Sequence, residues 1–168
     1  MQDVYIVGVG MTPFGRTLDV DIKTMARKAT EAALDDAGID KADIAGAFFA
    51  NATQGHMEDQ QMIRGQIVLR DMGIGGIPVF NVENACAGGS SALNLAVNFI
   101  KAEVGDVALA LGAEKMFSQD RDLMLAAFGG AWDVSKADEI KERLVKLGEG
   151  VEAPPGTPSD KPYSVFMD

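Results

Sequence analysis

The only cysteine of the sequence, Cys86, stands where a thiol can act as a nucleophile. It follows the short apolar segment 77–82 and precedes a helical pattern, so a strand should lead into a helix at this point. The first turn of a helix carries unpaired N–H groups and the positive end of the helix dipole, and both favour the thiolate form of a cysteine. The placement therefore indicates a reactive Cys86. The same spacing also allows a buried and inert cysteine, which is the usual fate of a free thiol.

The residues after Cys86 are very small, because alanines, glycines and serines fill positions 87–92. Gly88 and Gly89 would stand near the start of the helix, where each glycine costs about 1 kcal/mol relative to alanine. A helix that keeps such residues indicates a close approach of its backbone to a neighbour. That neighbour is either another helix or a substrate.

His56 and the pair Gly8 and Gly10 are the other residues whose types suggest chemistry. His56 is the only histidine, and it has no cysteine or histidine at metal-ligand spacing, so we expect a solvated loop residue and no metal site. Gly8 and Gly10 form a G-x-G pattern, but Pro13 occupies the third glycine position of a dinucleotide-binding fingerprint. The sequence therefore predicts no bound cofactor.

Alternating apolar runs and helical patterns predict the elements that position Cys86. Four runs indicate strands with helices between them, which is typical of an α/β fold with a parallel sheet. Ligands of such sheets bind beyond the carboxyl ends of the strands, where Cys86 falls. The helix after Cys86 is apolar nearly all round, so we expect it to be buried on several sides. The predicted strands are residues 4–10, 44–50, 77–82 and 107–112, and the predicted helices are residues 22–37, 60–72 and 86–100.

The alternation of strands and helices stops after Met116, which predicts two domains, residues 1–116 and residues 117–168. The second should hold a short helix at 122–128 and an amphipathic helix at 136–147, followed by a connector rich in glycine and proline. Ser159 and Asp160 are expected to cap a final helix.

Composition limits the classes of function. Of the 168 residues, 47% are hydrophobic and 24% charged, as in ordinary soluble domains. The net charge of −10 argues against a nucleic-acid surface, because phosphate binding needs clustered lysines and arginines. No segment approaches the roughly 20 apolar residues of a membrane span, and the amino terminus does not read as a signal peptide. A single cysteine excludes an internal disulfide and fits the cytoplasm, where thiols stay reduced.

Five separated segments resemble the thiolase superfamily, and in particular its sterol-carrier-protein-type, lipid-transfer-like branch. The segment 82–93, V-E-N-A-C-A-G-G-S-S-A-L, is similar to the nucleophile motif of that family. The resemblance spans the whole chain. The other segments, in the family's order, are V-x-I-V-G-V-G-M-T-P-F-G at 4–15, Gly65-Gln66, Gly76-Ile77-Pro78, and G-A-E-K-M at 112–116.

The resemblance implies a thiolase-like α/β fold of two similar halves, layered α-β-α-β-α, which normally forms a homodimer. This chain would supply the first α-β-α half and the start of the loop region that covers the acyl-CoA site. In the family, the second half carries a histidine and often a second cysteine that activate the nucleophile, and a further histidine or asparagine that helps to form the oxyanion hole. We therefore expect the second half to be a separate chain or a missing segment.

The resemblance also implies an acyl-CoA C-acyltransferase, in which the cysteine at the position of Cys86 takes the acyl group of a 3-oxoacyl-CoA as a thioester. Coenzyme A is then the co-substrate. A backbone N–H near Gly88 or Gly89 is expected to stabilise the oxyanion, since glycine lets a substrate come close. Relatives in this branch often work with a small zinc-ribbon and OB-fold protein, so such a partner is expected.

Two other functions stay open at this point. A retro-aldolase on the same fold would cleave a carbon–carbon bond of a CoA-linked steroid or aromatic side chain without needing Cys86. A non-catalytic half-domain would bind acyl-CoA or lipid without turnover.

Overall fold

The strand β1, Gly46–Ala50, is buried at every residue and forms the centre of the sheet. One of its edges pairs with β2, Val79–Val82, and the other with β3, Ala108–Gly112, and both pairings are parallel. The computed structural model describes residues 3–150, and within them the strand order is β2-β1-β3. Parallel pairing aligns the carboxyl ends of the strands, so that Ala50 is the partner of both Val82 and Gly112.

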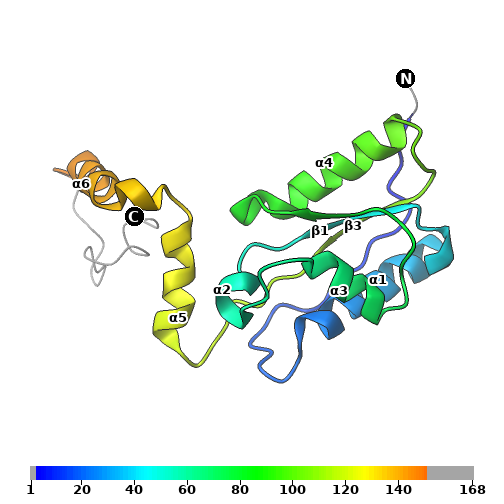
Figure 1. Ribbon diagram of the computed structural model, residues 1–168, viewed down its shortest axis with the longest axis horizontal. Helices are drawn as coiled ribbons and strands as arrows, with labels where there is room; N and C mark the ends of the chain where they lie inside the picture. The colour runs from blue at the N-terminus through cyan, green and yellow to red at the C-terminus, as the bar shows by residue number, and fades with distance from the viewer. Residues whose placement is uncertain (1–2, 151–168) are drawn as a thin grey trace. The chain divides into compact units, whose positions relative to one another are not determined.

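Helices cover both faces of this sheet (Figure 1). The helices α1, Ile22–Ala37, and α3, Arg64–Asp71, lie on one face, and α4, Gly88–Lys101, lies on the other. Successive strand residues point to opposite faces. Phe49 therefore packs among residues of α1 and α3, whereas Phe48 packs among residues of α4. This α-β-α arrangement agrees with the predicted fold class.

The chain divides into two compact units, Met1–Phe117 and Ser118–Asp168. The helices predicted at 122–128 and 136–147 correspond to α5, Arg121–Ala126, and α6, Ala137–Leu147, of the second unit. The final helix predicted from Ser159 lies outside the described residues. The described part of the second unit comprises α5, Arg121–Ala126, the 3₁₀ turns η3, Ala127–Gly130, and η4, Val134–Lys136, and α6, Ala137–Leu147.

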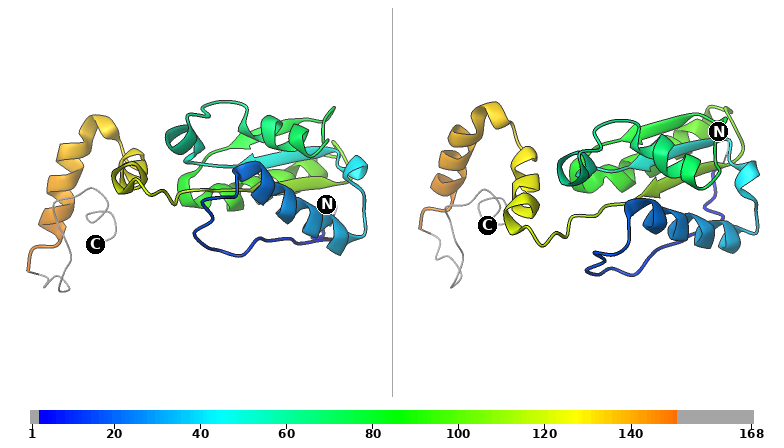
Figure 2. Two further views of the ribbon diagram at one scale, coloured as in Figure 1. Left: turned by 90° about the horizontal axis from the view of Figure 1, so that it is seen from below. Right: turned by 60° about the horizontal axis from the view of Figure 1, so that its bottom comes forward.

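The predicted buried strand at residues 4–10 is wrong. This segment runs beside α1 instead (Figure 2), where the backbone N–H of Val9 donates to Asp36 Oδ2 at 2.9 Å. Gly8 and Gly10 permit this approach, because a Cβ at either position would collide with a backbone carbonyl oxygen of α1. Both edges of β1 are already paired, so the segment has no place next to it, and Tyr5 is 75% exposed.

Three further expectations need correction within the first unit. The helix α4 is not buried on several sides, because its Leu93 and Leu95 are 44% and 41% exposed. The helix predicted at 60–72 begins only at Arg64, after Ile63 has adopted a positive φ of 50°. The loop after β1 holds a short helix, α2, Gln54–Glu58, and the turn before β1 is the 3₁₀ turn η1, Lys41–Asp43.

Capping interactions at both ends explain why α1 begins and ends at the predicted residues, 22 and 37. Asp21 is the N-cap, and its Oδ1 accepts a hydrogen bond of 2.7 Å from the backbone N–H of Thr24. Gly38 ends the helix in the left-handed conformation at φ 66°, which glycine adopts without steric cost. Hydrogen bonds from Thr24 are the main reason that the pKa of Asp21 lies below its ordinary value, and Lys23 and Lys115 lower it further.

Asp21→Ala should lower the free energy of unfolding by about 1 kcal/mol at neutral pH, because an N-cap carboxylate is lost. The folded-state pKa of Asp21 is lowered, so this stabilisation is fully present above the unfolded value of about 3.9 and disappears as pH falls through the folded value. Urea denaturation of both proteins at neutral and acidic pH measures the difference. Asp19→Ala, an exposed change outside the helix, is the control and should have little effect at either pH. A pH-independent loss in Asp21→Ala would contradict the capping role of the ionised carboxylate.

Among residues 3–150, the helices are too short or too polar to cross a membrane.

Candidate active site

A cavity of about 430 Å³ lies at the carboxyl ends of β1 and β3, within the first unit. Its walls come from the segment after β1, the segment after β3, the turn before α4, and the loop at residues 10–15 with part of α1. Cys86, Gly88 and Gly89 all line it, so the structure brings together the three predicted site residues. Within the described residues, no cluster of histidine, cysteine, aspartate and glutamate side chains is suited to hold a metal ion.

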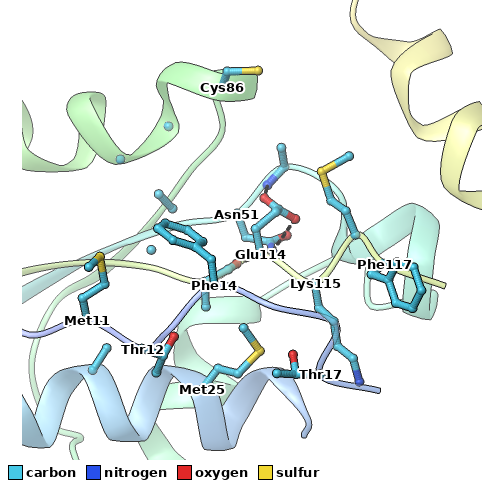
Figure 3. Close-up of a pocket in the computed structure, with 18 of the residues that line it drawn as sticks. Met11, Thr12, Phe14, Thr17, Met25, Asn51, Cys86, Glu114, Lys115 and Phe117 are labelled. Atoms are coloured by element: carbon cyan, nitrogen blue, oxygen red, sulfur yellow. Dashed lines mark hydrogen bonds between the residues drawn. The ribbon is translucent and has the colours of Figure 1, made fainter. Parts of the chain in front are cut away.

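Cys86 is exposed, so the alternative of a buried cysteine does not hold. It stands in the 3₁₀ turn η2, Ala85–Ala87, and α4 begins two residues later at Gly88. The thiol therefore precedes the α-helix rather than lying in its first turn. Figure 3 shows Cys86 on one side of the cavity and Met25 of α1 on the other, with the Phe14 side chain between them.

The turn that carries Cys86 has an unusual backbone held by side-chain hydrogen bonds. Ala85 has a φ of +44°, a region that residues other than glycine rarely adopt. Asn84 Nδ2 donates to Ser91 Oγ at 2.9 Å, which ties the turn to the first turn of α4. The backbone N–H of Ala85 donates to Glu83 Oε1 at 2.6 Å. Two hydrogen bonds, one from Asn84 and one from Ala85, therefore hold the backbone immediately before Cys86.

Ala85→Val should lower the free energy of unfolding by about 1–2 kcal/mol, because a β-branched side chain is poorly tolerated at positive φ. Ala85→Gly should be neutral or stabilising by up to about 1 kcal/mol, since glycine adopts this φ freely. Thermal or urea unfolding measures both. Ala87→Val, at φ −92° in the same turn, is the matched control and should stay within about 0.5 kcal/mol of the wild type. Equal effects of valine at both positions would show that the positive φ is not the cause.

The glycine run is not explained by packing against another helix. A Cβ on Gly88 would lie 3.5 Å from the Cβ of Ala50 on β1, which is an ordinary van der Waals contact. Apart from its chain neighbours and the backbone of its own helix, a Cβ on Gly89 would meet no atom of the described residues within 4 Å. The open side of Gly89 belongs to the cavity wall, so the space there is available to a ligand.

His56 lies in α2 and does not line the cavity that holds Cys86. His56 is the only histidine of the sequence, so no histidine of this chain lines the cavity that holds Cys86.

Sequence reasoning missed two polar residues of the cavity wall, Asn51 and Glu114, which lie side by side in Figure 3. Asn51 follows β1 and Glu114 comes two residues after the end of β3, and the Asn51 side chain donates to Glu114 Oε1 at 3.1 Å. The signal was available, since polar residues that follow two buried strands of one parallel sheet meet at the same edge.

Two basic side chains lie at or next to the wall of this cavity, although the net charge of the chain is −10. Lys115 lines it and donates to the backbone oxygen of Leu18 at 3.1 Å. The Arg16 guanidinium lies 5.1 Å from the ring centroid of Phe117, which also lines the cavity. A negatively charged ligand group can therefore find positive charge nearby.

The family model described as "Thiolase, N-terminal domain" matches residues 4–147 of the sequence. This chain belongs to the thiolase family. The match includes the turn with Cys86 and every segment of the cavity wall, so the resemblance expected from the five sequence segments is confirmed.

Individual thiolase relatives agree with the branch expected from the sequence. Benzoylsuccinyl-CoA thiolase subunit BbsB of Thauera aromatica is 41% identical over 115 residues, which are 67% of this chain and 28% of that protein. Non-specific lipid-transfer protein-like 2 of Caenorhabditis elegans is 42% identical over 116 residues, which are 67% of this chain and 27% of that protein. The chain thus matches less than a third of the length of these thiolase-family relatives.

A solved structure of the same fold is described as "Ltp2-ChsH2(DUF35) aldolase". It superposes with a TM-score of 0.53 at 18% sequence identity, covering 84% of this chain and 37% of that one. At this level of identity, the similarity supports the thiolase-like fold and carries no statement about chemistry.

Proposed function

We propose that this chain is the nucleophile-bearing half of an acyl-CoA C-acyltransferase that cleaves a 3-oxoacyl-CoA thiolytically. The observation that carries the proposal is an exposed Cys86 in the wall of a cavity, at the carboxyl ends of parallel strands, in a chain of the thiolase family. The cavity volume of about 430 Å³ falls within the range usual for small-molecule sites.

In the proposed reaction, the Cys86 thiolate attacks the 3-keto carbonyl carbon and forms a sulfur–carbon bond. We assign the stabilisation of the resulting oxyanion to a backbone N–H near Gly89, because the N–H of Gly88 already donates to the Ala85 carbonyl oxygen. The bond between C2 and C3 then breaks, its electron pair stays on C2 of the departing acetyl-CoA, and an acid protonates that carbon. The thiol of coenzyme A, deprotonated by a base, attacks the remaining thioester, which releases a shortened acyl-CoA and restores the Cys86 thiolate.

The acid and the base of this reaction are proposed to come from a second half of the enzyme. The single histidine of the sequence lies outside the cavity wall, and the single cysteine is the nucleophile itself. The name of the Thauera aromatica relative describes a subunit, which supports an assembly of more than one chain. A homodimer, a small zinc-ribbon and OB-fold partner and a cytoplasmic location belong to the same proposal.

The proposed ligand is anionic, and the cavity suits such a ligand. Coenzyme A carries phosphate groups, and in a chain whose net charge is −10 the cavity has Lys115 among its lining residues and Arg16 over the ring of Phe117, another lining residue. Local attraction of this kind offsets the repulsion that an acidic protein exerts on an anion.

Intact mass spectrometry of the full chain, purified with any polypeptide that accompanies it, tests the proposal with acetyl-CoA as the probe. We expect one acetyl group per chain, bound as a thioester that hydroxylamine removes, with release of coenzyme A. The absence of an acetyl adduct, or an adduct that resists hydroxylamine, would overturn the proposal.

A further inference from the structure

Glu114 lines the same cavity as Cys86. Because no histidine lines this cavity, the Glu114 carboxylate is a candidate for the missing base. Its hydrogen bonds point to a different role. Glu114 Oε1 accepts from Asn51 Nδ2 at 3.1 Å, from the backbone N–H of Thr53 at 3.0 Å and from the Thr53 hydroxyl. Glu114 Oε2 accepts from the backbone N–H of Ala52 at 2.8 Å.

A carboxylate has about four lone-pair sites, two on each oxygen. Three of the donors converge on Oε1, which is therefore fully occupied, whereas Oε2 accepts one hydrogen bond and keeps one acceptor site. A general base needs a free oxygen within hydrogen-bond reach of the proton that it removes. Every donor to Glu114 comes from the segment 51–53, and none of them is a reacting group. Both oxygens of the carboxylate are therefore anchored to that segment, and the geometry points to a structural use of this group.

Asn51, the first residue of the segment 51–53, is buried, and its side chain forms further hydrogen bonds outside the segment. Asn51 Nδ2 also donates to the backbone oxygen of Ala113 at 2.8 Å, and Asn51 Oδ1 accepts from Arg64 Nη1 at 2.9 Å. The backbone N–H of Ala113 in turn donates to the Ala50 oxygen at 3.2 Å. Asn51 and Glu114 thus connect the ends of β1 and β3 to α3, at the edge of the sheet where the cavity lies.

We propose that Glu114 is a positioning residue, which fixes the segment 51–53 as a wall of the substrate cavity and does not take the proton of Cys86. The inference rests on the proposed function for the role of Cys86. A fixed wall presents a preformed surface to the acyl-CoA, so its loss weakens substrate binding more than it slows the reaction of bound substrate.

Three variants of the full chain test this assignment. Glu114→Gln keeps one acceptor oxygen but replaces the other with an amide NH₂ group, which cannot accept a hydrogen bond from the donors of the segment 51–53. Thr53→Val removes only the hydroxyl donor, and Thr53→Ser restores it as the conservative rescue. Glu31→Gln changes an exposed carboxylate of α1 outside the cavity and serves as the matched control.

Amide hydrogen exchange measured by NMR should be about tenfold faster at Ala52 and Thr53 in Glu114→Gln, with a smaller increase in Thr53→Val and none in Thr53→Ser. The pH midpoint of Cys86 alkylation by iodoacetamide should be the same in all variants. For acetyl loading, the half-saturating concentration of acetyl-CoA should rise several-fold in Glu114→Gln while the maximal rate stays nearly unchanged.

A shifted alkylation midpoint in Glu114→Gln, or a lower maximal loading rate at an unchanged half-saturating concentration, would assign Glu114 as the base and overturn the inference. Unchanged amide exchange would overturn it as well. If the wild type takes no acetyl group, the proposed function fails, whereas amide exchange and the alkylation profile still decide the role of Glu114.

Discussion

Cys86→Ala should abolish acetyl loading from acetyl-CoA, with a rate at least about 10³-fold lower than that of the wild type, as expected when a covalent nucleophile is removed. Alanine has no atom that can form the thioester. Because Cys86 is exposed, the change should alter the free energy of unfolding by no more than about 0.5 kcal/mol, so loss of loading would not report unfolding. Intact mass over time, with denaturation of both proteins by urea, measures the two quantities.

Ser90→Ala provides the matched control for Cys86→Ala. Ser90 is exposed and lies in the first turn of α4, and it does not line the cavity. Its loss should leave acetyl loading at the rate of the wild type. Cys86→Ser keeps an oxygen nucleophile at the same position, and we expect it to load far more slowly than the thiol, because a serine hydroxyl needs an adjacent base.

The same variant separates the proposed function from the two alternatives. A retro-aldolase on this fold would keep its carbon–carbon cleavage in Cys86→Ala, because that reaction needs no thioester. A binding half-domain would show saturable binding of acyl-CoA by the wild type with no adduct and no product. Loading of Cys86→Ala at the rate of the wild type would place the nucleophile elsewhere and contradict the assignment.

Phe49→Ala should lower the free energy of unfolding by about 3–5 kcal/mol, the usual cost of removing a buried aromatic side chain. Phe49 is 1% exposed and packs in the cluster formed by α1, α3 and the sheet. A single domain has a total stability of only about 5–15 kcal/mol, so a substantial part of the chain should be unfolded at moderate temperature. Urea and thermal denaturation of the full chain, followed by circular dichroism, measure the loss.

Phe14→Ala is the matched control for Phe49→Ala, since Phe14 is 93% exposed. It removes the same atoms and should change the free energy of unfolding by no more than about 0.5 kcal/mol. Similar losses in the two variants would mean that the core does not centre on β1. Because Phe14 lines the cavity, acetyl loading by this control also reports whether its ring contributes to substrate binding.

Short-range patterns were sufficient for much of the fold. The bounds of α1 follow from an apolar face with a capping aspartate before it and a glycine after it, all within one segment. The succession of β2 and α4 follows similarly from a short apolar run and a helical pattern, whereas the 3₁₀ turn that holds Cys86 between them was not predicted. The prediction of a strand at 4–10 was wrong because its apolar residues fit a buried strand, whereas in the structure β2 and β3 occupy both edges of β1 and the segment runs beside α1.

The sequence by itself determined the thiolase family, the order of β1, α4 and β3, and Cys86 as the nucleophile to test, because each follows from patterns within short segments and from their order along the chain. Only the tertiary structure decided that Asn51 and Glu114 meet at the cavity of Cys86. These two residues are 63 positions apart. Each follows a predicted strand, but the sequence alone does not show that β1 and β3 are paired neighbours in the sheet. Parallel pairing of β1 with β3 brings the strand ends together, and the hydrogen bonds of Glu114 then make the segment after β1 part of the site.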